Sequence, residues 1–180
     1  YDDLAPSVVN INGKKGIVFL SNRTDNKLTT NKLDTILPIS KMDVFYYNLE
    51  TRPNYFVRVT NTPNLNEKSP VGIDSNWIAW LSEGNGIYNK QVGNYYETIV
   101  GYEKEAVYRD DKKIIYPIDS VLTKSDSFSL VYIDTIPIID RKFTHKNCSN
   151  LNRNIELTRF NSLNNQFADL ALIDGKYQIF

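Results

Sequence analysis

The sequence predicts an all-β protein assembled from repeated antiparallel units. Three observations support this prediction. Short runs rich in Val, Ile, Thr and the twelve tyrosines recur along the 180 residues, and these residue types favour pleated sheets. Gly, Pro, Asn and Asp separate the runs, as they do at turns. A pattern of proline, strand, tight turn and apolar strand ending in serine occurs twice, which indicates an internal repeat.

The first predicted element is a hairpin near the start of the chain. A strand over 7–11 and an apolar strand over 17–20 flank Asn12-Gly13. Asn-Gly between apolar runs predicts a two-residue turn, because both turn positions need a positive φ. Asp174-Gly175 predicts the same kind of turn between strands over 168–173 and 176–180.

Further strands are predicted between these two hairpins. A second hairpin is expected from 71–73 and 77–82, joined across 74–76. Single strands are expected over 43–49, 55–60, 87–91, 98–102, 114–118 and 129–133. Turn-rich residues 24–41 and Asn-rich residues 141–166 are expected to be irregular, and Lys104–Tyr108 is expected to hold one helical turn.

The repeat suggests how the strands assemble. Asp3–Ser7 leads to Ile17–Ser21, and Asn66–Pro70 leads to Ile78–Ser82, about 61–64 residues further on. Each copy is interpreted as one four-stranded antiparallel blade, with the loop at 24–41 lengthening the spacing beyond the usual roughly 40–45 residues. A blade cannot bury both faces alone, so blades stack around an axis. The predicted fold is a partial β-propeller of about three four-stranded antiparallel blades with long loops.

The whole chain, 1–180, is predicted to be a single propeller segment. Its blade-like units span roughly 1–60, 61–140 and a partial 141–180. Closed propellers contain roughly four to eight blades, and an open fan of three would leave large apolar faces bare. The chain starts at Tyr1 and ends at Phe180 within a predicted strand. We therefore expect the remaining blades to come from a longer parent chain, or another chain to cover these faces.

Residues 1–23 resemble the blade motif of TolB-type, WD-repeat-like β-propellers. The matching residues are Pro6, Ser7, Gly13, Phe19, Ser21, Asn22 and Arg23. The second copy matches at Pro70, Trp80 and Ser82, but Glu83 replaces the expected Asn and the Arg has no counterpart. The Asn- and Tyr-rich composition resembles that of Bacteroidetes cell-envelope proteins. The resemblance implies a non-enzymatic scaffold or binding module in the bacterial cell envelope, periplasmic or outer-membrane-associated, that mediates protein–protein interaction.

Composition excludes several other classes of function. Lys plus Arg equals Asp plus Glu at 21 each, so no basic excess predicts a nucleic-acid partner. No apolar run approaches the roughly 18 residues of a membrane-spanning helix. The lone cysteine, Cys148, has no internal disulfide partner. The expected partner is the protein that the resemblance implies, with a carbohydrate as the alternative.

No catalytic, cofactor-binding or metal-binding set is predicted, so the chain is not expected to be an enzyme. His145 and Cys148 lack the further ligands that zinc needs. Ser21 and Ser82 lack the Gly-x-Ser-x-Gly turn of a serine nucleophile. Carboxylate pairs for acid–base chemistry are weighed at the following acidic residues and interpreted as ordinary turn residues: Asp110, Asp111, Asp134 and Asp140.

Aromatic residues provide the candidate ligand contact. Trp77 and Trp80 are predicted to point to opposite faces of one strand, so one of them belongs to the core. Tyr95 and Tyr96, beside Gly93 and Asn94, are the predicted exposed contact. Two alternative functions follow: a carbohydrate-binding all-β module that uses its tyrosines, and the propeller portion of a hydrolase or peptidase whose catalytic domain lies outside these residues.

Overall fold

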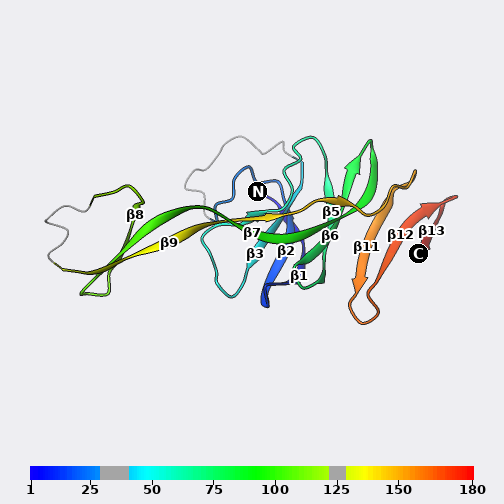
Figure 1. Ribbon diagram of the computed structural model, residues 1–180. Coiled ribbons are helices and arrows are strands. Elements are labelled where there is room, and N and C mark those ends of the chain that lie inside the picture. The colour runs from blue at the N-terminus through cyan, green and yellow to red at the C-terminus, as the bar shows by residue number, and fades with distance from the viewer. Residues whose placement is uncertain (29–40, 122–128) are drawn as a thin grey trace. The chain divides into compact units, whose positions relative to one another are not determined.

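The computed structural model describes residues 1–28, 41–121 and 129–180, and the regular elements of this part of the chain are all β-strands (Figure 1). The predicted all-β class with antiparallel sheets is thereby confirmed. The described strands are β1 (Asp3–Ile11), β2 (Lys14–Ser21), β3 (Asp43–Asn48), β4 (Val57–Arg58), β5 (Glu67–Asp74), β6 (Trp77–Gly84), β7 (Ile87–Tyr108), β8 (Lys113–Pro117), β9 (Leu130–Phe143), β10 (Lys146–Asn147), β11 (Ile155–Asn161), β12 (Gln166–Ile173) and β13 (Lys176–Ile179).

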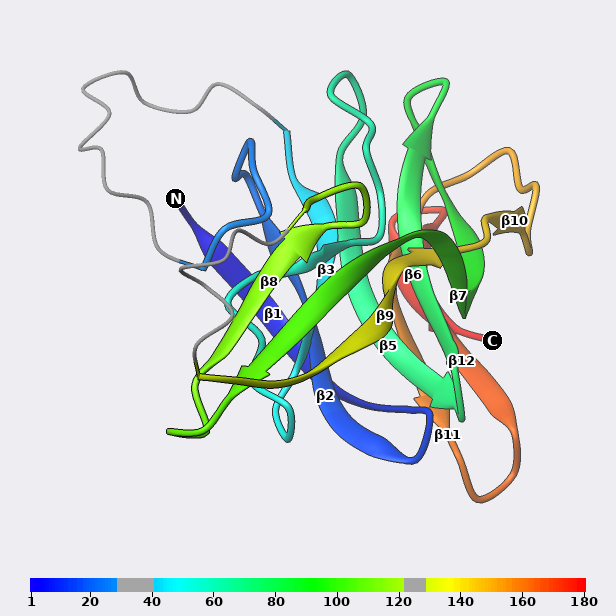
Figure 2. The same ribbon diagram turned by 60° about the vertical axis from the view of Figure 1, so that its left-hand side comes forward.

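These strands form three sheets. The first is an antiparallel meander in the order β1-β2-β3-β4, and the third follows the order β11-β12-β13. The second runs β10-β7-β6-β5, and β8 and β9 also pair with β7. The sheets follow one another in the chain, from blue and cyan through green to orange and red (Figures 1 and 2).

Both predicted two-residue hairpin turns are confirmed. Asn12 and Gly13 have φ of 52° and 73° between β1 and β2, and Asp174 and Gly175 have φ of 49° and 74° between β12 and β13. Positive φ at both central positions matches the right-handed twist of the flanking strands. The predicted second hairpin is also present as β5 and β6, which pair from Glu67 opposite Ser82.

Two expectations about secondary structure are wrong. Lys104–Tyr108 is not a helical turn but the end of β7, because β8 provides backbone partners for it, as in the pair of Lys104 with Tyr116. Residues 141–166 are not irregular throughout, because they contain β11. Of the predicted loop over 24–41, residues 29–40 lie outside the described residues.

The chain divides into two compact units. Unit 1 comprises Tyr1–Tyr96 and Lys142–Phe180, and unit 2 comprises Glu97–Arg141. Unit 1 contains the first and third sheets together with β5, β6 and β10. Unit 2 contains the C-terminal part of β7, β8 and most of β9. The single segment over 1–180 with three blade-like divisions stays a prediction.

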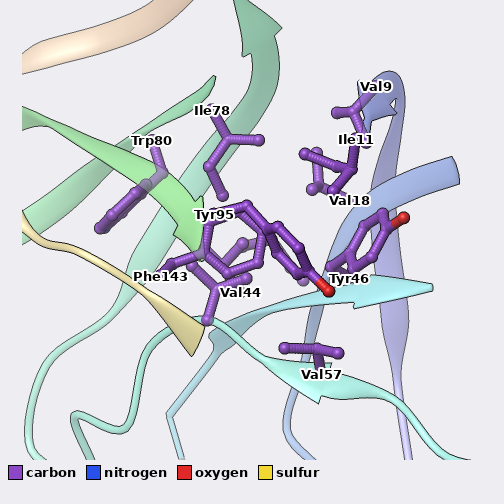
Figure 3. Close-up of a cluster of buried hydrophobic side chains, with 12 residues drawn as sticks. Val9, Ile11, Val18, Val44, Tyr46, Val57, Ile78, Trp80, Tyr95 and Phe143 are labelled. Carbon is purple, nitrogen blue, oxygen red and sulfur yellow. The ribbon is translucent and has the colours of Figure 1, made fainter. Parts of the chain in front are cut away.

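The main core of unit 1 lies between the first two sheets (Figure 3). Val18, Val44 and Tyr46 from the first sheet meet Trp80 and Tyr95 from the second. The Tyr46 and Tyr95 rings meet edge-on at 6.1 Å, and such pairs add stability beyond the apolar area that they bury. Alternation along β2 and β3 sends Phe19 and Phe45 to the other face, where they form a separate aromatic cluster.

Strand β5 contacts both other sheets, through β1 on one side and β11 on the other. Gly72 allows β1 to approach closely, because a Cβ there would lie 2.7 Å from the carbonyl oxygen of Val8. The third sheet is tied to the second by Lys90, whose Nζ lies 2.7 Å from the Asp169 carboxylate and 3.8 Å from the Phe167 ring centroid. The first strands of the three sheets are therefore neighbours in unit 1.

Candidate binding groove

Both copies of the repeat bend the chain at the same point of the first strand. Ala5 and Ser69 have φ of 49° and 51°, and each directly precedes a proline, Pro6 or Pro70. The register of β1 with β2 slips at the first of these places, and that of β5 with β6 slips at the second. A bulge of this kind turns a strand and re-aims its side chains. The repeated sequence pattern thus encodes a repeated bend.

An acidic residue lies opposite a serine in each copy, but within residues 1–28, 41–121 and 129–180 only the first pair has a cation. Asp3 lies opposite Ser21, and Arg23 donates hydrogen bonds to the Asp3 carboxylate at 2.7 and 2.8 Å and to the Ser21 hydroxyl at 2.9 Å. Glu67 lies opposite Ser82, which donates to its Oε1 at 3.1 Å. The buried Oε2 of Glu67 has no hydrogen-bond partner among the described residues.

A second pair exchanges its residue types between the copies. The side chain of Asn22 accepts a hydrogen bond from the backbone N–H of Asp2 at 2.8 Å. In the second copy Glu83 takes the place of this Asn, and its carboxylate accepts from the backbone N–H of Asn66 at 3.3 Å. In the first copy an acidic residue, Asp2, donates its backbone N–H to an amide side chain; in the second copy an amide residue, Asn66, donates its backbone N–H to an acidic side chain. The hydrogen bond itself is present in both copies. Glu83, which seemed a departure from the motif, is accommodated by this exchange.

Two adjacent cavities follow β1, β5 and β11 along unit 1. The first, of about 250 Å³, is lined by Ala5, Pro6, Ser7, Ser69, Pro70, Val71, Leu157 and Arg159. The second, of about 360 Å³, is lined by Val8, Val9, Asn10, Lys15, Gly72, Ile73, Asp74, Ser75, Phe160 and Ser162. The lining passes from Ser7 to Val8 on β1 and from Val71 to Gly72 on β5, so the cavities are consecutive. We call the surface formed by these residues the first-strand groove.

The first-strand groove combines apolar walls with a few polar groups, as ligand sites commonly do. Val8 is 70% exposed on β1, and the Pro6 and Pro70 rings line the neighbouring cavity. Proline has no backbone N–H to satisfy. Charged groups are sparse: Arg159 lines the first cavity, and Lys15 and Asp74 line the second. The groove can therefore receive an extended chain with apolar side chains and scattered polar groups.

The predicted tyrosine contact is divided by the structure. Tyr95 is buried in the core, with its ring 5.3 Å from that of Phe143, whereas Tyr96 on the opposite face is exposed. Trp77 is likewise exposed, and it pairs with Asn94, two residues before Tyr96 on the same side of β7. With the Asn94 amide oxygen toward the indole, it accepts a hydrogen bond from Trp77 Nε1 at 2.8 Å. Carbohydrate binding at this exposed pair stays a prediction.

The other residues weighed from the sequence lie partly in the core and partly on the surface. His145 Nε2 lies 2.7 Å from the carbonyl oxygen of Val59 and its ring packs on Trp80, which is fully buried, while Cys148 is exposed. Ser21 and Ser82 are buried. Asp110 and Asp134 accept hydrogen bonds from nearby backbone N–H groups. Within 1–28, 41–121 and 129–180, no group of three His, Cys, Asp or Glu side chains is placed to hold a metal.

Sequence reasoning did not predict the first-strand groove. It identified the segments around Pro6 and Pro70 as repeat motifs, and the structure shows that both segments bend and line one cavity. Arg159 was missed because it lies in a stretch expected to be irregular. No protein family, curated protein or solved structure significantly matches this chain. The described part of the chain contains no helix long and apolar enough to cross a membrane.

Proposed function

We propose that this chain is a non-enzymatic, propeller-type scaffold that binds a protein partner by receiving an extended segment of it in the first-strand groove. The observation that carries the proposal is the pair of consecutive cavities along β1, β5 and β11. A rigid β scaffold presents such a surface with little reorganisation on binding, which favours affinity.

The propeller part of the proposal is supported by how the sheets follow one another. Each sheet is built from strands that are consecutive in the chain, and strands paired with each other are consecutive except β9 and β10, which both pair with β7; the first strand of each sheet contacts a neighbouring sheet. First strands that line a common surface are expected of blades arranged around an axis. A closed ring requires at least about four blades, so the proposal includes further blades from a longer chain or a second chain, in a bacterial cell envelope.

The groove is suited to a peptide rather than to a compact small molecule. Its two cavities follow strands of eight or nine residues in β1 and β5, a length over which an extended peptide of several residues can lie. Side chains of an extended peptide point alternately to opposite sides, so every second one would enter the groove. Apolar side chains in these cavities would remove Val8 and its neighbours from water.

The proposal is tested by selecting binders from a random twelve-residue peptide library with the purified chain as bait. We expect selected peptides to perturb NMR amide resonances of β1, β5 and β11. We also expect Val8→Asp to weaken their binding by about tenfold or more, because a charge would then face an apolar occupant.

Leu163→Asp is the matched control, since Leu163 is 91% exposed and does not line the groove. Both variants should unfold at the same temperature as the parent chain. Failure to select any binding peptide, or equal binding by the Val8→Asp chain, would show that the groove is not a peptide site.

A further inference from the structure

The first cavity of the groove is lined by apolar residues, two serines and one arginine. Ala5 and Ser69, where the two strands bend, line it together with Pro6, Pro70 and Ser7. The walls thus consist of two proline rings and Leu157 from the third sheet. Hydroxyl groups both donate and accept, so Ser7 and Ser69 can each bond an acceptor that enters.

Arg159 is the single ionisable side chain lining this cavity among the described residues. Its Nη1 donates to the backbone carbonyl of Thr158 at 3.0 Å, which holds one side of the guanidinium in place. No carboxylate within the described part of the chain forms an ion pair with it, so its remaining N–H donors are open to a ligand. A guanidinium presents a planar fork of donors that matches a carboxylate in two parallel bonds.

Three acidic residues on the strands around the groove have cationic partners, whereas Asp74 lines the second cavity together with Lys15. Glu156 on β11 lies 3.1 Å from Lys68 Nζ, and Asp169 on β12 lies 2.7 Å from Lys90 Nζ. Asp3 on β1 is paired with Arg23. The cavity therefore keeps an uncompensated positive charge, and an anionic group is the complementary ligand.

The cavity volume sets the size of that ligand. A water molecule occupies about 30 Å³ of liquid, so a cavity of about 250 Å³ holds a carboxylate together with one small or medium apolar side chain. This is the size of the last residue of a peptide. The second cavity, which follows along the same strands, would take the residues that precede it.

We propose that the first cavity is a receptor for a peptide C-terminus. Arg159 binds the terminal carboxylate, the Ser7 and Ser69 hydroxyls complete its hydrogen bonds, and Pro6, Pro70 and Leu157 contact the last side chain. This inference rests on the proposed peptide-binding function and adds the end of the chain that is recognised and its direction along the groove.

The test uses peptides selected from a library displayed with free C-termini, each then synthesised as a free acid and as a C-terminal amide. We expect amidation to weaken binding by about 10- to 100-fold, because a charge-assisted bidentate interaction is lost. Arg159→Gln should weaken the free acid to a similar degree and leave the amide unaffected, while Arg159→Lys should retain part of the affinity. Arg153→Gln is the control, since Arg153 is exposed on unit 1 and does not line the cavity.

The two proposals fail differently. Equal binding of acid and amide peptides, or a loss of affinity with Arg159→Gln that is the same for both, overturns the C-terminal inference and leaves the peptide groove standing. Such a result would point to an internal acidic side chain or to a general structural effect. The absence of any binding peptide overturns both.

Discussion

At the scale of single residues, Asp3 and Glu67 show how the presence or absence of a neighbouring arginine changes the pKa of a carboxyl group. Burial opposes ionisation of Asp3, but hydrogen bonds from Arg23 and Ser21 and the charge of Arg23 lower its pKa overall. Glu67 takes the equivalent position without an arginine. Burial and, to a smaller extent, the nearby Asp43 carboxylate raise the pKa of Glu67 to about 7, against the hydrogen bonds from Thr62 and Ser82, which lower it.

This difference predicts the pH dependence of stability. The Glu67 pKa in the folded chain is above its ordinary value of 4.5, so the folded state holds a proton that the unfolded state has lost between pH 4.5 and about 7. The contribution of Glu67 to the free energy of unfolding should therefore fall as pH rises through this range, by about 3 kcal/mol at most, and level off above it.

Glu67→Gln tests this expectation, because an amide keeps the shape and does not titrate. Denaturant titrations at pH 5 and pH 8 should show a smaller loss of stability with rising pH in this variant than in the parent chain. Glu103→Gln, on β7 in unit 2, should leave the dependence unchanged. If the free energy of unfolding changed equally between pH 5 and pH 8 in all three chains, ionisation of Glu67 would not destabilise the folded state.

At the scale of elements, the approach of β1 to β5 depends on Gly72. A Cβ at this position would lie 2.7 Å from the Val8 carbonyl oxygen and 2.9 Å from Val9 Cγ1, both closer than van der Waals contact. The Val8 carbonyl oxygen belongs to the backbone, so a side-chain rotation alone cannot relieve the clash. The first and second sheets are therefore held together at a point where only glycine fits.

Gly72→Ala should lower the free energy of unfolding by about 1–3 kcal/mol, the usual effect of overpacking. Gly84→Ala is the matched control, because a Cβ at Gly84, in β6, has no neighbouring atom within 4 Å. Denaturant unfolding followed by the fluorescence of the buried Trp80 measures the free energy of unfolding of both variants. Equal stability of the two variants would show that β1 and β5 separate without cost.

At the scale of the whole molecule, the two units differ in how much they bury. Among the described residues of unit 2, only Ala106, Val107 and Tyr108 are buried. Unit 1 contains the shared core of its first two sheets. Hydrogen-bonded strands without a buried core open at low free-energy cost, so the units should differ in local stability.

Strand β7 allows this difference to be measured within one element, since Ile87–Tyr96 belongs to unit 1 and Glu97–Tyr108 to unit 2. Hydrogen exchange followed by mass spectrometry or NMR should show amides of 97–102 exchanging at least about tenfold faster than those of 88–95. Uniform protection along β7 would mean that the two units open together.

Particular residues show how far sequence reasoning reached. The turns at Asn12-Gly13 and Asp174-Gly175 were predictable because each depends on two adjacent residues. The alternation of Tyr95 and Tyr96 was equally local, but which of them faces the core depends on first-sheet residues such as Tyr46, which lies 49 positions before Tyr95. Lys104–Tyr108 was misassigned for a more local reason, since its strand conformation comes from a hairpin with β8, whose paired residues lie only 6 to 12 positions further on, from Val107 with Lys113 to Lys104 with Tyr116.

The sequence by itself determined the all-β class, the hairpin turns and the recurrence of the proline-containing pattern, because these follow from residue types, φ preferences and alternation within a few residues. Only the tertiary structure decided that both bends share a cavity, that Glu67 Oε2 is buried without a hydrogen-bond partner among the described residues, and that Arg159 lines the same cavity as Pro6 and Pro70. These features join residues from 64 to more than 150 positions apart, and they arise from the packing of β1, β5 and β11, which no local pattern specifies.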